Sequence, residues 1–270
     1  MRSPHRLLPL AALALLPACS MNWGGGIKSE RTEEVSFTAE GAEAIRVESI
    51  NGRIELVAGE VAEPTGSTKY YARASTQEEA DARVAEMGWS TAVEGGVLVL
   101  KVEPPKDSRS NCGANLVLTV PAGWNVEANT SNGGVLVKGD FPRSLVDTSN
   151  GSVKVESDGT VRVKTSNGRI EYLGDSDDFE LRTSNGKVEV DLAGDWDGRG
   201  TINTSNGSVR VRCEGQLDAV VDADTSNGKI RVEGPEMGDG GRLRVDTSNG
   251  SVTVTHTGSK MSTEPAETQG

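Results

Sequence analysis

Hydrophobic and polar residues alternate with a period of two on both sides of a short motif, Thr-Ser-Asn-Gly, that occurs seven times in the 270-residue chain. The third and fifth residues after each asparagine are apolar or aromatic, as Val153 and Val155 are after Asn150. A period of two predicts β-strands, and the change of phase at Asn-Gly predicts a turn. The asparagines recur every 17 to 22 residues, which is typical of a repeat architecture, at Asn132, Asn150, Asn167, Asn185, Asn206, Asn227 and Asn249.

Two architectures satisfy this pattern. In a hairpin meander, each Asn-Gly would form a tight turn between paired strands. In a β-solenoid, each period would be one coil, and coils would stack about 4.8 Å apart. The recurrence of Thr and Ser at fixed positions favours the solenoid, because identical residues can form ladders along the stack, with Thr and Asn pointing inward. Asn and Gly would supply the left-handed backbone of a sharp corner.

The first third of the chain is less regular and predicts a separate arrangement. A capping box at Thr76–Glu79 and apolar residues on one helical face predict a short helix from Gln77 to Met87. We expect this helix to lie in an insertion, about residues 58–115, that covers one end of the solenoid. Five strands are expected, over 35–38, 45–48, 54–57, 97–102 and 116–120. The prediction is therefore an all-β, single-domain solenoid over residues 33–256, with a disordered tail over 257–270.

The start of the chain reads as an address. Basic residues, an apolar run from Leu7 to Leu16 and the ending Leu-Pro-Ala-Cys predict a signal peptide over residues 1–18. The ending resembles a bacterial lipobox, in which Cys19 is lipidated; the alternative is an ordinary signal peptide with an incidental cysteine. The glycine-rich residues 19–32 are expected to be a flexible tether. Ser20 after the cysteine favours the outer membrane of a bacterial envelope.

Charge and rare residues exclude several function classes. The net charge of −12 argues against binding of nucleic acid. The mature chain would keep one histidine, His256, which we expect to be a solvated terminal residue, so neither histidine-based catalysis nor a histidine-rich metal site is expected. Cys112 and Cys213 could form a disulfide in an oxidising compartment. No catalytic residue, metal site or cofactor is predicted.

Candidate binding residues lie in the variable polar loops between the motifs. Insertions in solenoids collect on one face, which is often the face that binds a ligand. Trp196 could be an exposed contact for a saccharide or protein, or it could plug the core through its loop. Calcium coordination by the loop aspartates is a weaker alternative, since no loop has the spacing of a known calcium motif. The candidates are Asp175, Asp177, Asp178, Asp195, Trp196 and Asp197.

The repeated Ser-Asn-Gly corners, together with the stretch from Leu116 to Trp124 that leads into Asn129–Gly133, resemble the bacterial putative-adhesin family of envelope proteins. The resemblance covers roughly Ala44 to Thr255 and implies a β-helical surface protein. We therefore expect a non-catalytic envelope lipoprotein that binds or scaffolds, with an envelope protein or a saccharide as partner. The alternatives are a regulatory accessory lipoprotein of envelope stress and a polysaccharide-active β-helix enzyme.

Overall fold

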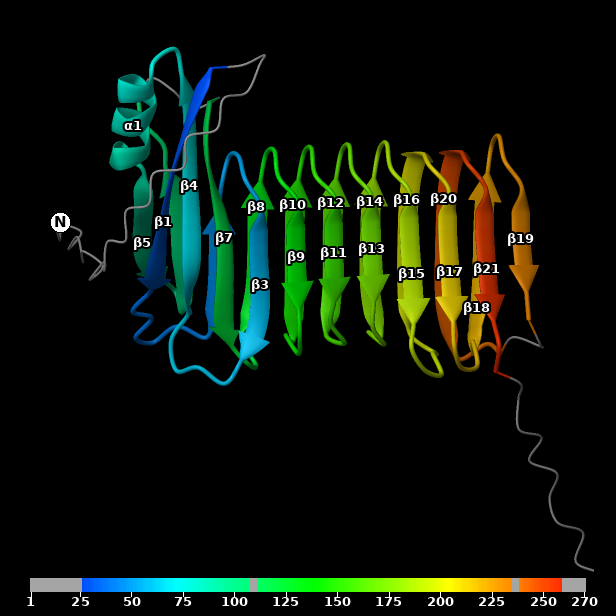
Figure 1. Cartoon of the computed structure of the whole chain (residues 1–270). Helices are drawn as coiled ribbons and strands as arrows, with labels where there is room; N and C mark the ends of the chain where they lie inside the picture. Colours follow the sequence, from blue (N-terminus) through cyan, green and yellow to red (C-terminus); the bar gives the residue numbers. More distant parts are fainter. Residues whose placement is uncertain (1–25, 107–110, 235–237, 259–270) are drawn as a thin grey trace, which may run out of the picture.

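The computed structural model describes residues 26–106, 111–234 and 238–258, and these residues form two large mixed β-sheets with one short helix (Figure 1). The prediction of a mainly β protein with one short helix is confirmed. The sheet with 11 strands has the order β1-β4-β7-β3-β9-β11-β13-β15-β17-β21-β19, and the sheet with 10 strands has the order β18-β20-β16-β14-β12-β10-β8-β2-β6-β5.

The elements of the first part are β1 (Ile27–Ser36), β2 (Ala44–Glu48), β3 (Ile54–Gly59), β4 (Thr65–Ala74), α1 (Gln77–Glu86), β5 (Gly88–Glu94), β6 (Val97–Glu103) and β7 (Cys112–Pro121). Those of the repeat region are β8 (Asn125–Thr130), β9 (Val135–Lys138), β10 (Arg143–Thr148), β11 (Val153–Glu156), β12 (Thr160–Thr165), β13 (Ile170–Leu173), β14 (Asp178–Thr183), β15 (Val188–Leu192), β16 (Arg199–Asn206), β17 (Val209–Cys213), β18 (Ala219–Thr225), β19 (Ile230–Glu233), β20 (Gly241–Asn249) and β21 (Val252–His256).

Each Thr-Ser-Asn-Gly corner joins a strand of the smaller sheet to a strand of the larger one. The two strands that flank a corner do not pair with each other in the part of the chain that the structure describes; each pairs in parallel with the equivalent strand of a neighbouring repeat. Val153 of β11, for example, lies in register between Val135 of β9 and Ile170 of β13. The hairpin alternative is therefore wrong, because a hairpin would pair the flanking strands with each other in antiparallel fashion.

The period-two pattern has its expected effect on burial. Along β11, Val153 and Val155 are buried while Lys154 is exposed, and the other repeats follow the same alternation except the β18–β19 pair, where all of β19 is exposed. The inward side chains of both sheets form one continuous apolar core. Removal of this apolar surface from water is the main stabilising contribution to the stack.

The N-terminal end carries the expected helix and more strand than the sequence suggested. Helix α1 begins after Thr76, whose hydroxyl accepts a hydrogen bond from the Glu79 amide at 3.2 Å, so the predicted capping box is confirmed. The tether expected over 19–32 is wrong from Ile27 onward, because β1 pairs antiparallel with β4 along ten residues. Strands β4 and β5 were also not predicted, since their apolar residues alternate too weakly.

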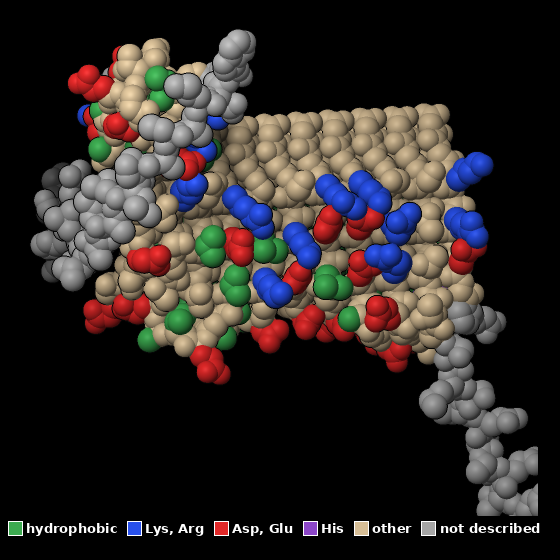
Figure 2. All heavy atoms as spheres, viewed as in Figure 1, with side chains coloured by type: hydrophobic (Ala, Val, Ile, Leu, Met, Phe, Trp, Pro, Cys, Tyr) green, Lys and Arg blue, Asp and Glu red, His purple; other side chains and the backbone are tan. Residues whose placement is uncertain are grey.

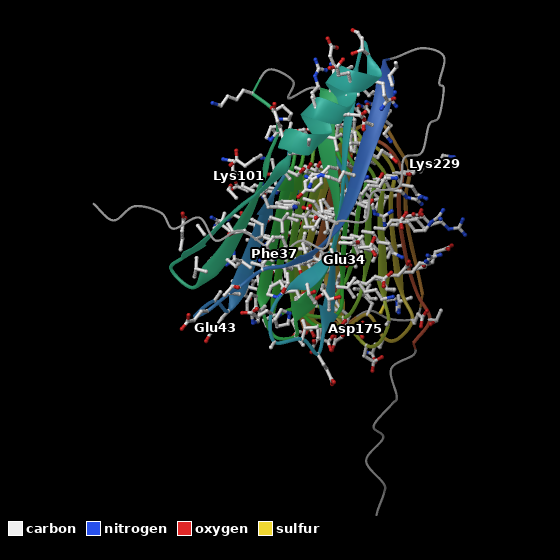
Figure 3. All side chains as sticks on the ribbon, turned by 60° about the vertical axis from the view of Figure 1, so that its left-hand side comes forward. Glu34, Phe37, Glu43, Lys101, Asp175 and Lys229 are labelled. Carbon is white, nitrogen blue, oxygen red and sulfur yellow. The ribbon has the colours of Figure 1, made fainter. Side chains whose placement is uncertain are left out.

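These N-terminal elements cover one end of the core. Helix α1 packs on β1 and β4 (Figure 3). The rings of Phe37 and Trp89 meet edge to face, with centroids 6.3 Å apart, and both residues pack on the apolar core. The Trp89 indole also donates a hydrogen bond to the Thr68 hydroxyl at 3.0 Å. The prediction that a helix-bearing segment covers one end of the stack is consistent with this packing.

The order of repeats at the other end departs from the order along the chain. Strands β20 and β21, the last described strands, lie between the β16–β17 repeat and the β18–β19 repeat. The inserted strands bury Leu243 and Val245, whereas the displaced β18 offers only Val221 and Ala223 at the equivalent positions. In the smaller sheet this order places the larger side chains inside, where they bury more apolar area. We name the β18–β19 pair the terminal repeat.

Candidate functional site

The corner motif is an array of contacts between neighbouring repeats. In six repeats the threonine hydroxyl donates a hydrogen bond of 3.0–3.2 Å to the corner-glycine carbonyl of the adjacent repeat, as Thr183 does to Gly168. Most of these threonines are buried, so a lost partner would leave a polar group without a hydrogen bond inside the protein. The threonines are therefore structural rather than available to a ligand.

The seven motif asparagines and Asn51 form an unbroken series of side-chain hydrogen bonds. The amide nitrogen of each motif asparagine donates to the amide oxygen of the neighbouring repeat at 2.8–2.9 Å, and Asn51 accepts the bond at the end of the series. The seven motif asparagines are exposed, so the expectation that they point inward is wrong. Figure 2 shows the corners as a regular band without charged or hydrophobic side chains along the upper edge of the molecule.

The corner glycines are needed for space and not for a left-handed backbone. No described residue other than glycine has a positive φ, and the only motif-like glycine with one is Gly52, at 120°. A β-carbon at Gly186 would lie 1.9 Å from the Gly168 carbonyl oxygen, and the other motif glycines are equally close to a neighbouring repeat. The predicted role of Asn and Gly as left-handed corner residues is therefore wrong; the tight stacking of the backbones selects glycine.

The amide series makes a prediction about which asparagines are energetically coupled. We expect Asn206→Ala and Asn249→Ala to couple by about 0.5 kcal/mol or more in a double-mutant cycle of unfolding free energies, because their amides are hydrogen-bonded at 2.9 Å. Asn206 and Asn227 are neighbours along the chain but not in the stack, so their effects should add. Coupling of Asn206 to Asn227 instead would contradict the observed order of repeats.

The candidate loop residues contribute mostly to structure. Asp175 accepts hydrogen bonds from the backbone amides of Ala193 and Gly194 in the next repeat, at 2.7 and 3.1 Å, and Asp195 accepts one from Gln216 at 2.6 Å. Figure 3 shows Asp175 at the loop edge of the molecule, opposite the corners. These two carboxylates therefore join adjacent loops, much as the asparagines join adjacent corners.

The remaining loop candidates divide into paired, buried and unpaired side chains. Asp178 forms an ion pair with Arg162. Trp196 is 2 % exposed and packs on Phe179, so it plugs the core and is not an exposed contact. Asp177 and Asp197 are exposed, and no ion pair or side-chain hydrogen bond of theirs is seen among the described residues. The described residues contain no group of three or more His, Cys, Asp or Glu side chains placed to hold a metal ion.

The two cysteines are too far apart to form a disulfide. Cys112 lies in β7 and Cys213 in β17, six strand positions apart in the same sheet, which corresponds to roughly 29 Å at the usual spacing of strands. A disulfide needs α-carbons within about 7 Å. Both thiols are free and buried, and burial raises the pKa of each, so the predicted disulfide is wrong and neither thiol is activated.

The expectation that His256 is a solvated terminal residue is wrong. Instead of being solvated near the tail, it is 4 % exposed at the end of β21, beside Cys213 of β17. Neither ring nitrogen has a hydrogen-bond partner within the described part of the chain. Its alternation with Val252 and Val254 was the signal that could have placed it inside.

The outer face of the larger sheet carries neighbouring basic and acidic side chains, which are visible in Figure 2. A groove of about 500 Å³ runs across β3, β9, β11 and β13 on this face. The groove exists because Gly134 and Ser152 occupy adjacent positions where the next repeats carry Arg169 and Lys187. Two consecutive small residues leave a hollow that is bordered by longer side chains.

Charged groups line this groove and neutralise one another. Arg53 pairs with Glu55 at 3.4 Å, and Glu156 pairs with Lys154 at 2.6 Å and Lys138 at 3.2 Å. The hydrogen bond from Lys154 is the main reason that the pKa of Glu156 lies below its usual value. Exposed pairs of this kind contribute little to stability, about 0–1 kcal/mol each. They leave a polar surface with donors and acceptors of both charges.

Five of the described carboxyl groups have a pKa below its usual value: Glu30, Asp81, Glu127, Glu156 and Glu189. Hydrogen bonds or neighbouring cations stabilise the ionised form of each, so these five groups are ionised at neutral pH. None of the five has the raised pKa that the acid of a usual glycosidase needs.

The predicted lipidation site, Cys19, lies outside the described residues, as does nearly all of the predicted tail. Within the described residues no helix is long and apolar enough to cross a bilayer.

Comparison with known proteins gives structural similarities only. No protein-family model matches the sequence, and no curated protein is significantly similar to it. Among solved structures, a putative adhesin from Bacteroides fragilis is 11% identical, with a TM-score of 0.47, over 84% of this chain and 98% of that one. A putative cell adhesion protein from Clostridium sporogenes is 10% identical, with a TM-score of 0.39, over 84% and 100%. A putative adhesin from Parabacteroides distasonis is 10% identical, with a TM-score of 0.36, over 86% and 97%.

Proposed function

We propose that this protein is a non-catalytic binding or scaffolding protein of the bacterial cell envelope, built as a β-solenoid. The observation that carries the proposal is the use of the repeated motif: its threonine, asparagine and glycine are all engaged in contacts between repeats. A motif used for stacking supports a rigid scaffold and leaves recognition to the outer surfaces. The downward shifts of the carboxyl pKa values support the same conclusion.

The groove on the larger sheet is the proposed binding surface. It is open, it lies on rigid strands, and it offers both cationic and anionic groups at Lys138, Lys154 and Glu156. An extended polar ligand such as a saccharide chain could exchange hydrogen bonds with these side chains along several repeats. Binding sites built on strands hold their side chains more accurately than sites on loops.

Lipidation at Cys19 and placement in the outer membrane are part of the proposal. All described strands lie between Ile27 and His256, so a lipid on residue 19 would leave the whole β region free to project from the membrane. Incorporation of a labelled fatty acid into the wild-type chain, and its loss in Cys19→Ser, would test the anchor. Retention of the label in the variant would contradict it.

The binding proposal predicts the effect of filling the groove. Ser152→Arg should weaken binding of a saccharide found on a glycan array by about tenfold, because the new side chain would occupy the hollow. The fold should tolerate it, since Arg169 stands at the same position of the next repeat. Binding would be measured with the chain from Ser20, which keeps every described strand.

Ser208→Arg is the matched control. It makes the same substitution at the same motif position, but Ser208 does not line the groove. Equal losses for both variants would show that the groove is not the site. Release of new reducing ends from any glycan that binds would overturn the non-enzymatic proposal in favour of a polysaccharide-active enzyme.

A further inference from the structure

The terminal repeat leaves one end of the core open. Its strands β18 and β19 each have a single neighbour, β20 and β21, and lie at the right-hand end of Figure 1. Ile230 and Val232 of β19 are 46 % and 38 % exposed, although they are in register with Val252 and Val254, which are fully buried. Their side chains are at positions that face the core in the other repeats, but no further repeat covers them within the part of the chain that the structure describes.

The opposite end of the stack is covered by other elements. There β1, β5 and helix α1 extend beyond the repeats, and Phe37 and Trp89 close the core. Exposed sheet edges invite pairing with another chain, and proteins usually protect them with proline, a bulge or a covering segment. Neither β18 nor β19 contains a proline. Strands β1 and β5 are also edge strands, but only at the terminal repeat do the edges of both sheets lie beside exposed inward-facing residues, Ile230 and Val232, among the described residues.

We propose that the terminal repeat is a dimerisation surface on which a second copy of this chain docks end to end. Strand β18 runs toward the Asn227-Gly228 corner and β19 runs away from it. A two-fold axis parallel to these strands would place β18 of the partner beside β19 in antiparallel fashion, and β19 of the partner beside β18. Each sheet would continue into the partner, with about four backbone hydrogen bonds on each side, and Ile230 and Val232 would be covered.

Charge complementarity supports a second copy of this chain as the partner at the terminal repeat. Asp224 lies three residues before Asn227 and Arg231 three residues after Gly228, so both stand at the same distance from the corner on the outer faces of their strands. The two-fold arrangement puts Asp224 of one copy opposite Arg231 of the other, and it does so twice. Within one chain these residues lie in different sheets. Arg231 forms an exposed ion pair with Glu233 of its own strand, and no ion pair of Asp224 is seen among the described residues.

The position of Asp224 in the single chain adds to the argument. Its in-register neighbour on β20 is Asp246, which pairs with Arg244 of its own strand at 2.8 Å. No ion pair of Asp224 itself is seen among the described residues, so an arginine from a partner could pair with it. Both complementary groups lie at the same end of the same chain, so a second copy related by two-fold symmetry supplies both of them. The covered area is small, so we expect a reversible dimer.

Sedimentation velocity of the chain from Ser20, from micromolar to millimolar protein, would test the proposal. We expect a concentration-dependent dimer. Asp224→Arg should weaken dimerisation by about tenfold, because it sets two arginines against each other. The double variant Asp224→Arg with Arg231→Asp should restore it, since the pair is re-formed with its charges exchanged. A purely intramolecular role would show no such rescue.

Asp147→Arg is the matched control, because Asp147 occupies the same motif position in β10, in the middle of the stack, and should leave dimerisation unchanged. Ile230→Lys should give a folded monomer by circular dichroism, since this side chain is already half exposed in the single chain. A monomer at every concentration, equal effects of Asp224→Arg and Asp147→Arg, or no rescue would overturn the proposal. None of these results depends on saccharide binding, so the proposed function is tested separately.

Discussion

Gly186→Ala is expected to lower the free energy of unfolding by about 4 kcal/mol or more, or to prevent folding, although it adds only one methyl group. The β-carbon would lie 1.9 Å from the Gly168 carbonyl oxygen and 3.0 Å from the Thr183 hydroxyl oxygen. The first of these is backbone and cannot move away without breaking the hydrogen bond that Thr183 donates to it. Neighbouring repeats would have to separate along the whole corner. Urea unfolding followed by circular dichroism would measure the loss.

Gly88→Ala provides the comparison. A β-carbon at Gly88 would meet nothing within 4 Å, and this glycine has no positive φ. Its replacement should change stability by about 0.5 kcal/mol or less in either direction. If the two variants were equally stable, the close backbone stacking at the corner would be wrong.

Trp196→Ala is expected to destabilise the protein by about 3–5 kcal/mol, a typical cost for removing a large buried aromatic side chain. The indole is 2 % exposed, its ring centroid lies 5.6 Å from that of Phe179, and its nitrogen donates a hydrogen bond of 2.8 Å to the Ser176 carbonyl. The substitution would leave a cavity and an unpaired carbonyl in the same place. Chemical unfolding and the thermal midpoint would both report it.

Asp197→Ala, in the same loop, is the control. Its side chain is exposed, with no ion pair seen among the described residues, so stability should change by about 0.5 kcal/mol or less. If Trp196→Ala were as stable as Asp197→Ala, the tryptophan would be an exposed contact residue and not part of the core. The pair therefore distinguishes a buried core residue from an exposed residue at the next position of the chain.

Much of the candidate site depended on information that single residues do not carry. The loop aspartates were predicted to bind a ligand because they are polar and lie in loops that differ between repeats. Asp175 and Asp195 instead accept backbone hydrogen bonds from a loop about 20 residues away. The groove was not predicted at all, since it arises from Gly134 and Ser152 being small in two adjacent repeats. Aligning the repeats by position after the asparagine would have shown that coincidence.

The sequence by itself determined the strands of the repeats, the positions of the corners and helix α1, but not β1, β4 and β5. Alternation of apolar residues and the capping box at Thr76 act locally, so the same residues adopt the same elements wherever the segment is placed. The repeated Asn-Gly also indicated that each corner needs an amide side chain followed by a residue without a side chain. The physical reason for the glycine, however, lies in the neighbouring repeat and not in its own backbone.

The tertiary structure alone decided which repeats are neighbours. Seven identical corners are interchangeable as pairing partners, so nothing local prevents the β20–β21 repeat from entering ahead of the terminal repeat. The burial of His256, the separation of Cys112 from Cys213 and the open face at Ile230 all follow from that choice and from the length of the stack. Local pattern specifies the unit, whereas the burial of side chains between units specifies their order.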